Sequence, residues 1–236
     1  MGNYSVNCAD GLFCFGKIPF EIKTVVIAEK MRISPGSQDY GILAGMVESA
    51  LKTGVPRAIY RAAQVSGRMP ETILIDGISF RSRLLSANIG ETCTIFPYVA
   101  TCGRELDEWS RQYTDPFFSY VAEAVKESVL ASALKFLYCH LMKAYGIVKY
   151  SRMAPGSLAD WPIEEQKPFF RMMGGVEKET GVILTENYLM IPSKSVSGII
   201  FPSERSFESC MVCPRSGCRG RKAEYDRDLF DRIVKG

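Results

Sequence analysis

Apolar side chains recur at helical spacing in two long segments of the chain. In residues 39–52 they fall on one face of a helix, and a glycine and a proline follow as stop signals. In residues 116–145 they recur every three or four positions, which corresponds to a helix of about 45 Å. Asp115 ahead of a first-turn proline and Gly146 at the far end predict the two ends of this helix.

Alternating and β-branched runs predict strands elsewhere. Residues 72–80 alternate around Asp76 and Gly77, a dipeptide typical of tight hairpin turns. Residues 18–34 fit either a strand or a short helix. Further strands are expected over residues 93–103 and 182–201, and short helices over residues 104–113 and 163–175. The order of elements predicts an α+β fold, with long helices packed on a twisted, mainly antiparallel sheet.

Length, composition and net charge limit the classes of protein to which the chain can belong. The chain has 236 residues, 47% of them apolar, and a net charge of +3. We divide it into an α+β domain over residues 1–201 and a cysteine-containing extension over residues 202–236.

The small net charge gives no reason to expect nucleic acid or a membrane as a partner. No apolar run is long enough to cross a bilayer, so we expect a cytoplasmic protein. With His140 as the single histidine, a serine–histidine triad is not expected.

The stretch KYSRMAPGSLADWP, residues 149–162, combines one arginine with small and rigid residues. Pro155 and Gly156 fix an extended turn, and alanine and glycine leave its backbone uncovered for hydrogen bonds with a ligand. Arg152 at the head of the turn can hold a carboxylate. The stretch therefore suggests a small ligand with a carboxylate. A plain loop between a helix and a sheet, with Arg152 on the surface, explains the same residues.

A second block of residues connects this stretch to a known family. Leu184-Thr185-Glu186-Asn187 and Pro192-Ser193-Lys194-Ser195-Val196-Ser197-Gly198 follow it at a similar spacing. Together with Arg152-x-Ala154-Pro155-Gly156, they resemble the activation domain of vitamin B12-dependent methionine synthase, most specifically over residues 148–201.

The resemblance implies a function. In that family the activation domain binds S-adenosylmethionine and docks on the cobalamin domain, where an electron from a flavodoxin-type donor and the methyl group restore methylcobalamin. The domain acts by positioning, so no catalytic residue is expected. Carried over by position, Arg152 would bind the methionine carboxylate, and the segment Ala154, Pro155, Gly156 and Ser157 would line the ligand. The partner would be a cobalamin-binding protein, such as a methionine synthase without its own activation domain.

The chain departs from the family pattern at two ligand-binding positions. Ser157 stands where the family has a tyrosine, and Ala131 aligns with the family's glutamate on the long helix. Glu123 and Glu127 lie one to two turns earlier. Because a sulfonium cation gains from a nearby carboxylate, we expect binding of S-adenosylmethionine to be weak.

Cysteines crowd the extension at a spacing typical of metal sites. Cys210, Cys213 and Cys218 form a C-x2-C-x4-C pattern, and Cys102 could supply a fourth ligand. An iron–sulfur cluster at these cysteines would make the protein an electron relay. Its electron donor could then be of the flavodoxin type or of the ferredoxin type. A structural zinc ion, or thiols that are free or redox-paired, are alternatives. The alternative function is thus a metal-binding partner or electron carrier of a corrinoid protein that has lost S-adenosylmethionine binding.

Overall fold

The fold is built on one twisted, antiparallel sheet. The structure, a computed structural model, describes residues 6–9, 11–204, 207–218, 221 and 223–231. The strands follow the order β1-β2-β3-β7-β4-β5-β6, and β7 also pairs with β11, which carries β8 at its outer edge. These strands are β1 (Val6–Ala9), β2 (Leu12–Phe15), β3 (Arg57–Arg61), β4 (Ala63–Met69), β5 (Thr72–Ile75), β6 (Ile78–Arg81), β7 (Thr94–Thr101), β8 (Tyr150–Met153) and β11 (Ser195–Pro202).

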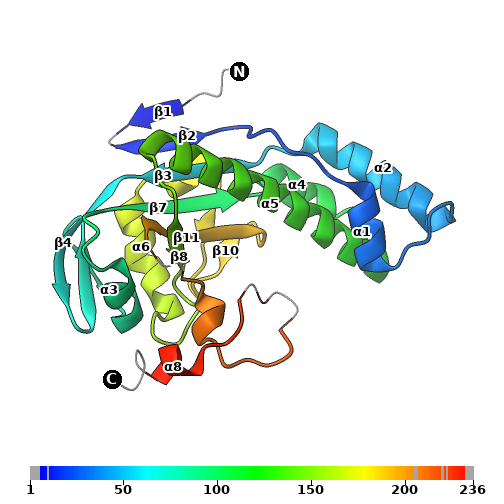
Figure 1. Cartoon of the computed structure of the whole chain (residues 1–236). Coiled ribbons are helices and arrows are strands. Elements are labelled where there is room, and N and C mark those ends of the chain that lie inside the picture. The colour runs from blue at the N-terminus through cyan, green and yellow to red at the C-terminus, as the bar shows by residue number, and fades with distance from the viewer. Residues whose placement is uncertain (1–5, 10, 205–206, 219–220, 222, 232–236) are drawn as a thin grey trace.

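Helices cover both faces of the sheet (Figure 1). One face carries α1 (Thr24–Met31), α2 (Gln38–Thr53), α4 (Arg104–Ser110) and the long α5 (Pro116–Tyr145). The other face carries α3 (Arg83–Ile89), α6 (Gln166–Met173), which continues the short 3₁₀ helix η1 (Ile163–Glu165), and α7 (Val176–Thr180). A small hairpin, β9 (Ile183–Leu184) with β10 (Met190–Ile191), precedes β11. The expected α+β architecture with a mainly antiparallel sheet is therefore confirmed.

The central strand β7 shows why the core has two layers. Its side chains alternate between the faces, because successive residues of a strand point to opposite sides. Phe96 and Tyr98 face the layer that contains α5, whereas Ile95 and Val99 face the layer that contains α6. All four are buried, as expected for a strand covered on both faces.

The predicted ends of the long helix are confirmed. The Asp115 carboxylate accepts hydrogen bonds from the amides of Phe117 and Phe118, and Gly146 ends the helix in a left-handed conformation. The hairpin at Asp76 and Gly77 also forms, between β5 and β6. The ambiguous region 18–34 contains helix α1 and no strand.

The cysteine-containing extension packs on the rest of the molecule. Its described part includes the 3₁₀ helix η2 (Ser209–Val212) and the short α8 (Arg227–Phe230). Phe207 and Val212 are buried in the core layer on the α6 side. None of the helices in the described ranges is both long and apolar enough to span a bilayer.

Candidate functional site

Arg152 lies on the edge strand β8, on the face of the sheet that α5 covers. In the register of β8 with β11, Arg152 is opposite Ile200, whose side chain belongs to the same layer. Tyr150 precedes Arg152 by two residues, and alternation along a strand places both side chains on one face. Tyr138 of α5 packs against this pair, with its ring centroid 5.8 Å from that of Tyr150.

Two aromatic rings hold the guanidinium of Arg152. Its central carbon lies 5.1 Å from the ring centroid of Tyr138 and 6.0 Å from that of Tyr150, within the range of cation–π attraction. The Tyr138 hydroxyl is in turn 3.0 Å from the hydroxyl of the buried Tyr98. Desolvation opposes the charge of Arg152, but hydrogen bonds to Glu208 and Tyr138 outweigh it, and the pKa of Arg152 is raised. The arginine is thus a fixed, permanently charged anion-binding group.

A carboxylate of the extension already contacts this group. Glu208 Oε1 accepts a hydrogen bond from Arg152 Nη2 at 2.6 Å, and the two side chains are 32% and 20% exposed. The sequence analysis did not identify Glu208, because it lies 56 residues from Arg152 in the chain. Tyr150 could have been found, since strand alternation places it beside Arg152.

The turn after β8 is closed by its own hydrogen bonds. The amide of Gly156 donates to the carbonyl of Trp161 at 2.7 Å, and the amide and hydroxyl of Ser157 both donate to the carbonyl of Ala154. Gly156 has a φ of +80°, and a Cβ there would come within 2.9 Å of Ile163, so only glycine suits the position. Gly156 and Ser157 are exposed, Ala154 is half-buried and Pro155 is buried. The expected uncovered backbone is therefore limited to the tip of the turn.

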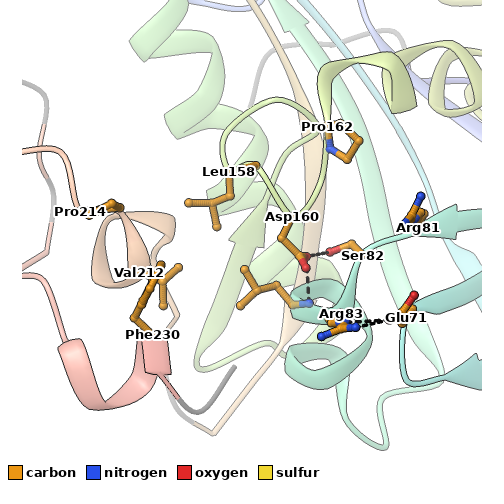
Figure 2. Close-up of a pocket in the computed structure, with 12 residues that line it drawn as sticks. Glu71, Arg81, Ser82, Arg83, Leu158, Asp160, Pro162, Val212, Pro214 and Phe230 are labelled. Atoms are coloured by element: carbon orange, nitrogen blue, oxygen red, sulfur yellow. Dashed lines mark hydrogen bonds and ion pairs between the residues drawn. The ribbon is translucent and has the colours of Figure 1, made fainter. Parts of the chain in front are cut away.

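A cavity of about 690 Å³ opens beside the same turn (Figure 2). One wall is polar and carries Glu71, Arg81 and Arg83, with an ion pair between Arg83 and Glu71. The opposite wall is apolar and includes Val212 and Phe230 of the extension. Further lining residues are Ser82, Leu84, Leu158, Ala159, Asp160, Pro162 and Pro214. A ligand that extends from the turn would find both a charged and an apolar surface here.

The acidic side chains of the long helix have other partners. Glu127 forms an ion pair with Lys30 at 2.8 Å, and Glu123 pairs with Lys126 and Lys194. Ala131 is exposed and lines a notch. We find no contact between these acidic groups and Arg152 among the described interactions.

The structure does not bring the four predicted cysteine ligands together. Among the described residues, no three histidine, cysteine or acidic side chains form a group that could hold a metal ion. Cys102 is fully buried, its thiol donates to the carbonyl of Gly103, and burial raises its pKa to about 12. Cys102 is thus not grouped with the cysteines of the extension among the described residues, and its role as a fourth ligand stays a prediction.

The loop that carries the other three cysteines is organised by Arg221. Its guanidinium donates to the carbonyls of Cys210 at 2.8 Å, Cys213 at 3.0 Å and Arg215 at 2.6 Å, and more weakly to that of Ala223 at 3.3 Å. The C-x2-C part of the motif is thus folded around an internal cation. A metal at Cys210, Cys213 and Cys218 stays a prediction.

Comparisons with protein families and with solved structures find similar proteins. Residues 114–209 match the family described as vitamin B12-dependent methionine synthase, activation domain. The fold is similar to the crystal structure of the MetH reactivation domain bound to AdoHcy, with a TM-score of 0.58 and 19% identity over 80% of this chain and 69% of that chain. A search of curated proteins gives no match. Residues 114–209 thus match the activation domain family of vitamin B12-dependent methionine synthase, and the chain has a mixed α+β fold similar to that of the MetH reactivation domain.

Proposed function

We propose that the protein takes part in the reductive reactivation of a corrinoid protein, such as methionine synthase, by docking on it and presenting S-adenosylmethionine to its cobalamin. One electron from an external donor reduces the inactive Co(II) to Co(I). Co(I) then takes the methyl group from the sulfonium, so that a Co–C bond forms, an S–C bond breaks and S-adenosylhomocysteine leaves. This chain supplies position and charge and no acid–base group.

The observation that carries the proposal is Arg152 within the matched family segment. Its guanidinium lies against Tyr138 and Tyr150 at the edge of the sheet, where a carboxylate can reach it. The AdoHcy bound to the similar MetH domain carries an amino-acid carboxylate of this kind. In this chain Arg152 would bind the carboxylate, and Ala154, Pro155, Gly156 and Ser157 would lie along the ligand.

Calorimetry tests the ligand part of the proposal. We expect S-adenosylmethionine and S-adenosylhomocysteine to bind the intact chain weakly, and Arg152→Ala to reduce the affinity at least tenfold, since charge-assisted hydrogen bonds are worth about 1.5–3 kcal/mol. Arg171→Ala, at an exposed arginine of α6, is the matched control and should bind like the wild type. No heat at millimolar ligand, or equal affinity in the Arg152 variant, would rule out the methyl-donor role.

Turnover tests the docking part. A cobalamin-binding partner, trapped in its Co(II) state, should regain methylcobalamin only with this protein, a flavodoxin-type reductant and S-adenosylmethionine together. Recovery that does not need S-adenosylmethionine would favour the alternative, a metal-binding electron carrier. No group of described side chains favours that alternative, and metal and sulfide analysis of protein purified without oxygen tests it directly.

A further inference from the structure

Residues 207–213, which we call the tail segment, run along the proposed ligand-binding turn. Three consecutive residues of this segment contact β8 or the turn that follows it. The amide of Phe207 donates to the hydroxyl of Ser151 at 2.8 Å, Glu208 binds Arg152, and the hydroxyl of Ser209 is 3.4 Å from that of Ser157. The tail segment therefore lies beside β8 and the turn.

Buried apolar residues anchor the tail segment on both sides of Glu208. Phe207 is 5% exposed and Val212 is 2% exposed, both within the core layer on the α6 side. The carbonyl of Glu208 accepts a hydrogen bond from the amide of Met211 at 2.8 Å, which starts the 3₁₀ helix η2. The backbone at Glu208 is thus held beside Arg152, and only the side chain of Glu208 has to be ordered for the ion pair to form.

The group that Glu208 presents to Arg152 is chemically the same as the one that an amino-acid ligand would present. Its Oε1 lies 2.6 Å from Arg152 Nη2, one of the two terminal nitrogens of the guanidinium. A second carboxylate needs the same donors for a bidentate contact, and it would be repelled by the first. The guanidinium carbon also lies near the rings of Tyr138 and Tyr150, and Tyr138 hydrogen-bonds to Arg152, so a second carboxylate competes with Glu208 for the remaining donors.

We propose that Glu208 is a built-in competitor for the ligand's carboxylate, and that ligand binding at Arg152 displaces the tail segment. The inference rests on the proposed function, because it assigns a regulation to the same arginine. Only molecules with the tail segment released are competent to bind, so the observed affinity falls by the fraction that is released. Displacement would also move Cys210 and Cys213, which follow Glu208 by two and five residues. Ligand binding at Arg152 is then linked to the conformation of the loop that carries these two cysteines.

Affinities of matched variants test the competition. We titrate the full chain with S-adenosylhomocysteine in the wild type, Glu208→Gln, Glu224→Gln and Arg152→Ala. Glu208→Gln removes the competing charge and keeps the shape, so its affinity should rise about tenfold. Glu224 is an exposed carboxylate of the same extension, and its variant should bind like the wild type. Arg152→Ala should bind least.

Hydrogen exchange in the wild-type chain tests the displacement without any substitution. Peptides that cover residues 207–213 should exchange faster at saturating S-adenosylhomocysteine, and Glu208→Gln should show fast exchange without ligand. Equal affinity of the wild type and Glu208→Gln, with binding lost in Arg152→Ala, would overturn the inference alone. Unchanged exchange in the saturated wild type would also overturn it. Absence of binding in both the wild type and Glu208→Gln would overturn the proposed function and the inference with it.

Discussion

Asp160, in the loop after the proposed ligand-binding turn, caps a helix that lies 76 residues earlier in the chain. Its Oδ2 accepts hydrogen bonds from the buried hydroxyl of Ser82 and from the amide of Leu84, at the start of α3 (Figure 2). The Ser82 hydroxyl also accepts from the amide of Leu85 at 2.9 Å. One carboxylate thus joins the loop to the first turn of α3 and closes one side of the cavity.

We expect Asp160→Ala to lower the free energy of unfolding by about 1–3 kcal/mol, because it leaves the buried Ser82 hydroxyl and the Leu84 amide without their acceptor. Urea unfolding measures the change. Glu164→Gln, at an exposed carboxylate four residues later, is the matched control and should stay within about 0.5 kcal/mol of the wild type. A variant as stable as the control would mean that the contact contributes nothing to stability.

Gly198 of β11 permits the close approach of β8. A Cβ at this position would lie 2.8 Å from the carbonyl oxygen of Met153 and 3.3 Å from the hydroxyl of Tyr98. Gly198→Ala should therefore shift the backbone next to Arg152 and destabilise the protein by about 1–3 kcal/mol. The matched control is Gly45→Ala in α2, where a Cβ meets nothing within 4 Å and the helix should gain about 0.5–1 kcal/mol. Thermal unfolding of both variants compares them, and equal melting temperatures would contradict the close approach.

The elements that the sequence predicted correctly carry local signals. The helix after Asp115 has a cap, a proline and a glycine stop, and the hairpin at Asp76 and Gly77 has its turn dipeptide. Residues 18–34 lack such signals. Val25 and Val26 favour a strand on propensity, yet both are 56% exposed on α1, which forms because Ile27 and Ala28 pack into the core. Tertiary packing outweighs local preference there.

The sequence analysis found only those residues of the site that lie close together in the chain. Arg152 was found because the turn that follows it is compact and resembles a known family segment. Glu208 and Tyr138 reach the same guanidinium from an extension and from a helix, and nothing in the local sequence of either points to Arg152. The burial of Cys102 after β7 could not be predicted for the same reason, since it depends on the core layer that α4 and α5 form.

His140 gives the protein a pH-dependent contribution to stability. Its Nε2 lies 2.9 Å from the hydroxyl of Tyr60, and its ring packs edge-on against Phe15. Burial lowers the pKa of His140 below its ordinary value of 6.5, so the folded state prefers the neutral ring. The unfolded chain binds this proton more readily, and the contribution is complete above pH 6.5 and is lost as the pH falls through the lowered pKa.

Because the chain has a single histidine, its ring signal in a proton NMR titration needs no assignment, and we expect a midpoint below 6.5. Urea unfolding at pH 7.5 and pH 5.5 should show a smaller loss of stability in His140→Gln than in the wild type. A midpoint at or above 6.5 would show that the ring is as well solvated in the folded protein as in the unfolded chain.

The thiols should differ sharply in reactivity. Burial raises the pKa of Cys102 from its usual 9.0 to about 12, which lowers its thiolate fraction at neutral pH about a thousandfold. Cys93 and Cys139 are exposed. Alkylation of the native protein, read by peptide mass spectrometry, should therefore modify Cys93 and Cys139 and leave Cys102 intact until the protein is unfolded. Rapid modification of Cys102 would contradict its place in the core.

The same experiment, repeated after addition of zinc, tests the metal prediction for the extension. If Cys210, Cys213 and Cys218 bind a metal, their alkylation should slow at least tenfold, because a coordinated thiolate is a poor nucleophile. Cys93, which lies outside the motif, provides the internal control and should react at its original rate. Equal rates with and without zinc, together with protein that contains neither iron nor sulfide when purified without oxygen, would leave these cysteines as ordinary thiols. The loop would then keep its fold without a metal, with the carbonyl hydrogen bonds to Arg221 among its contacts.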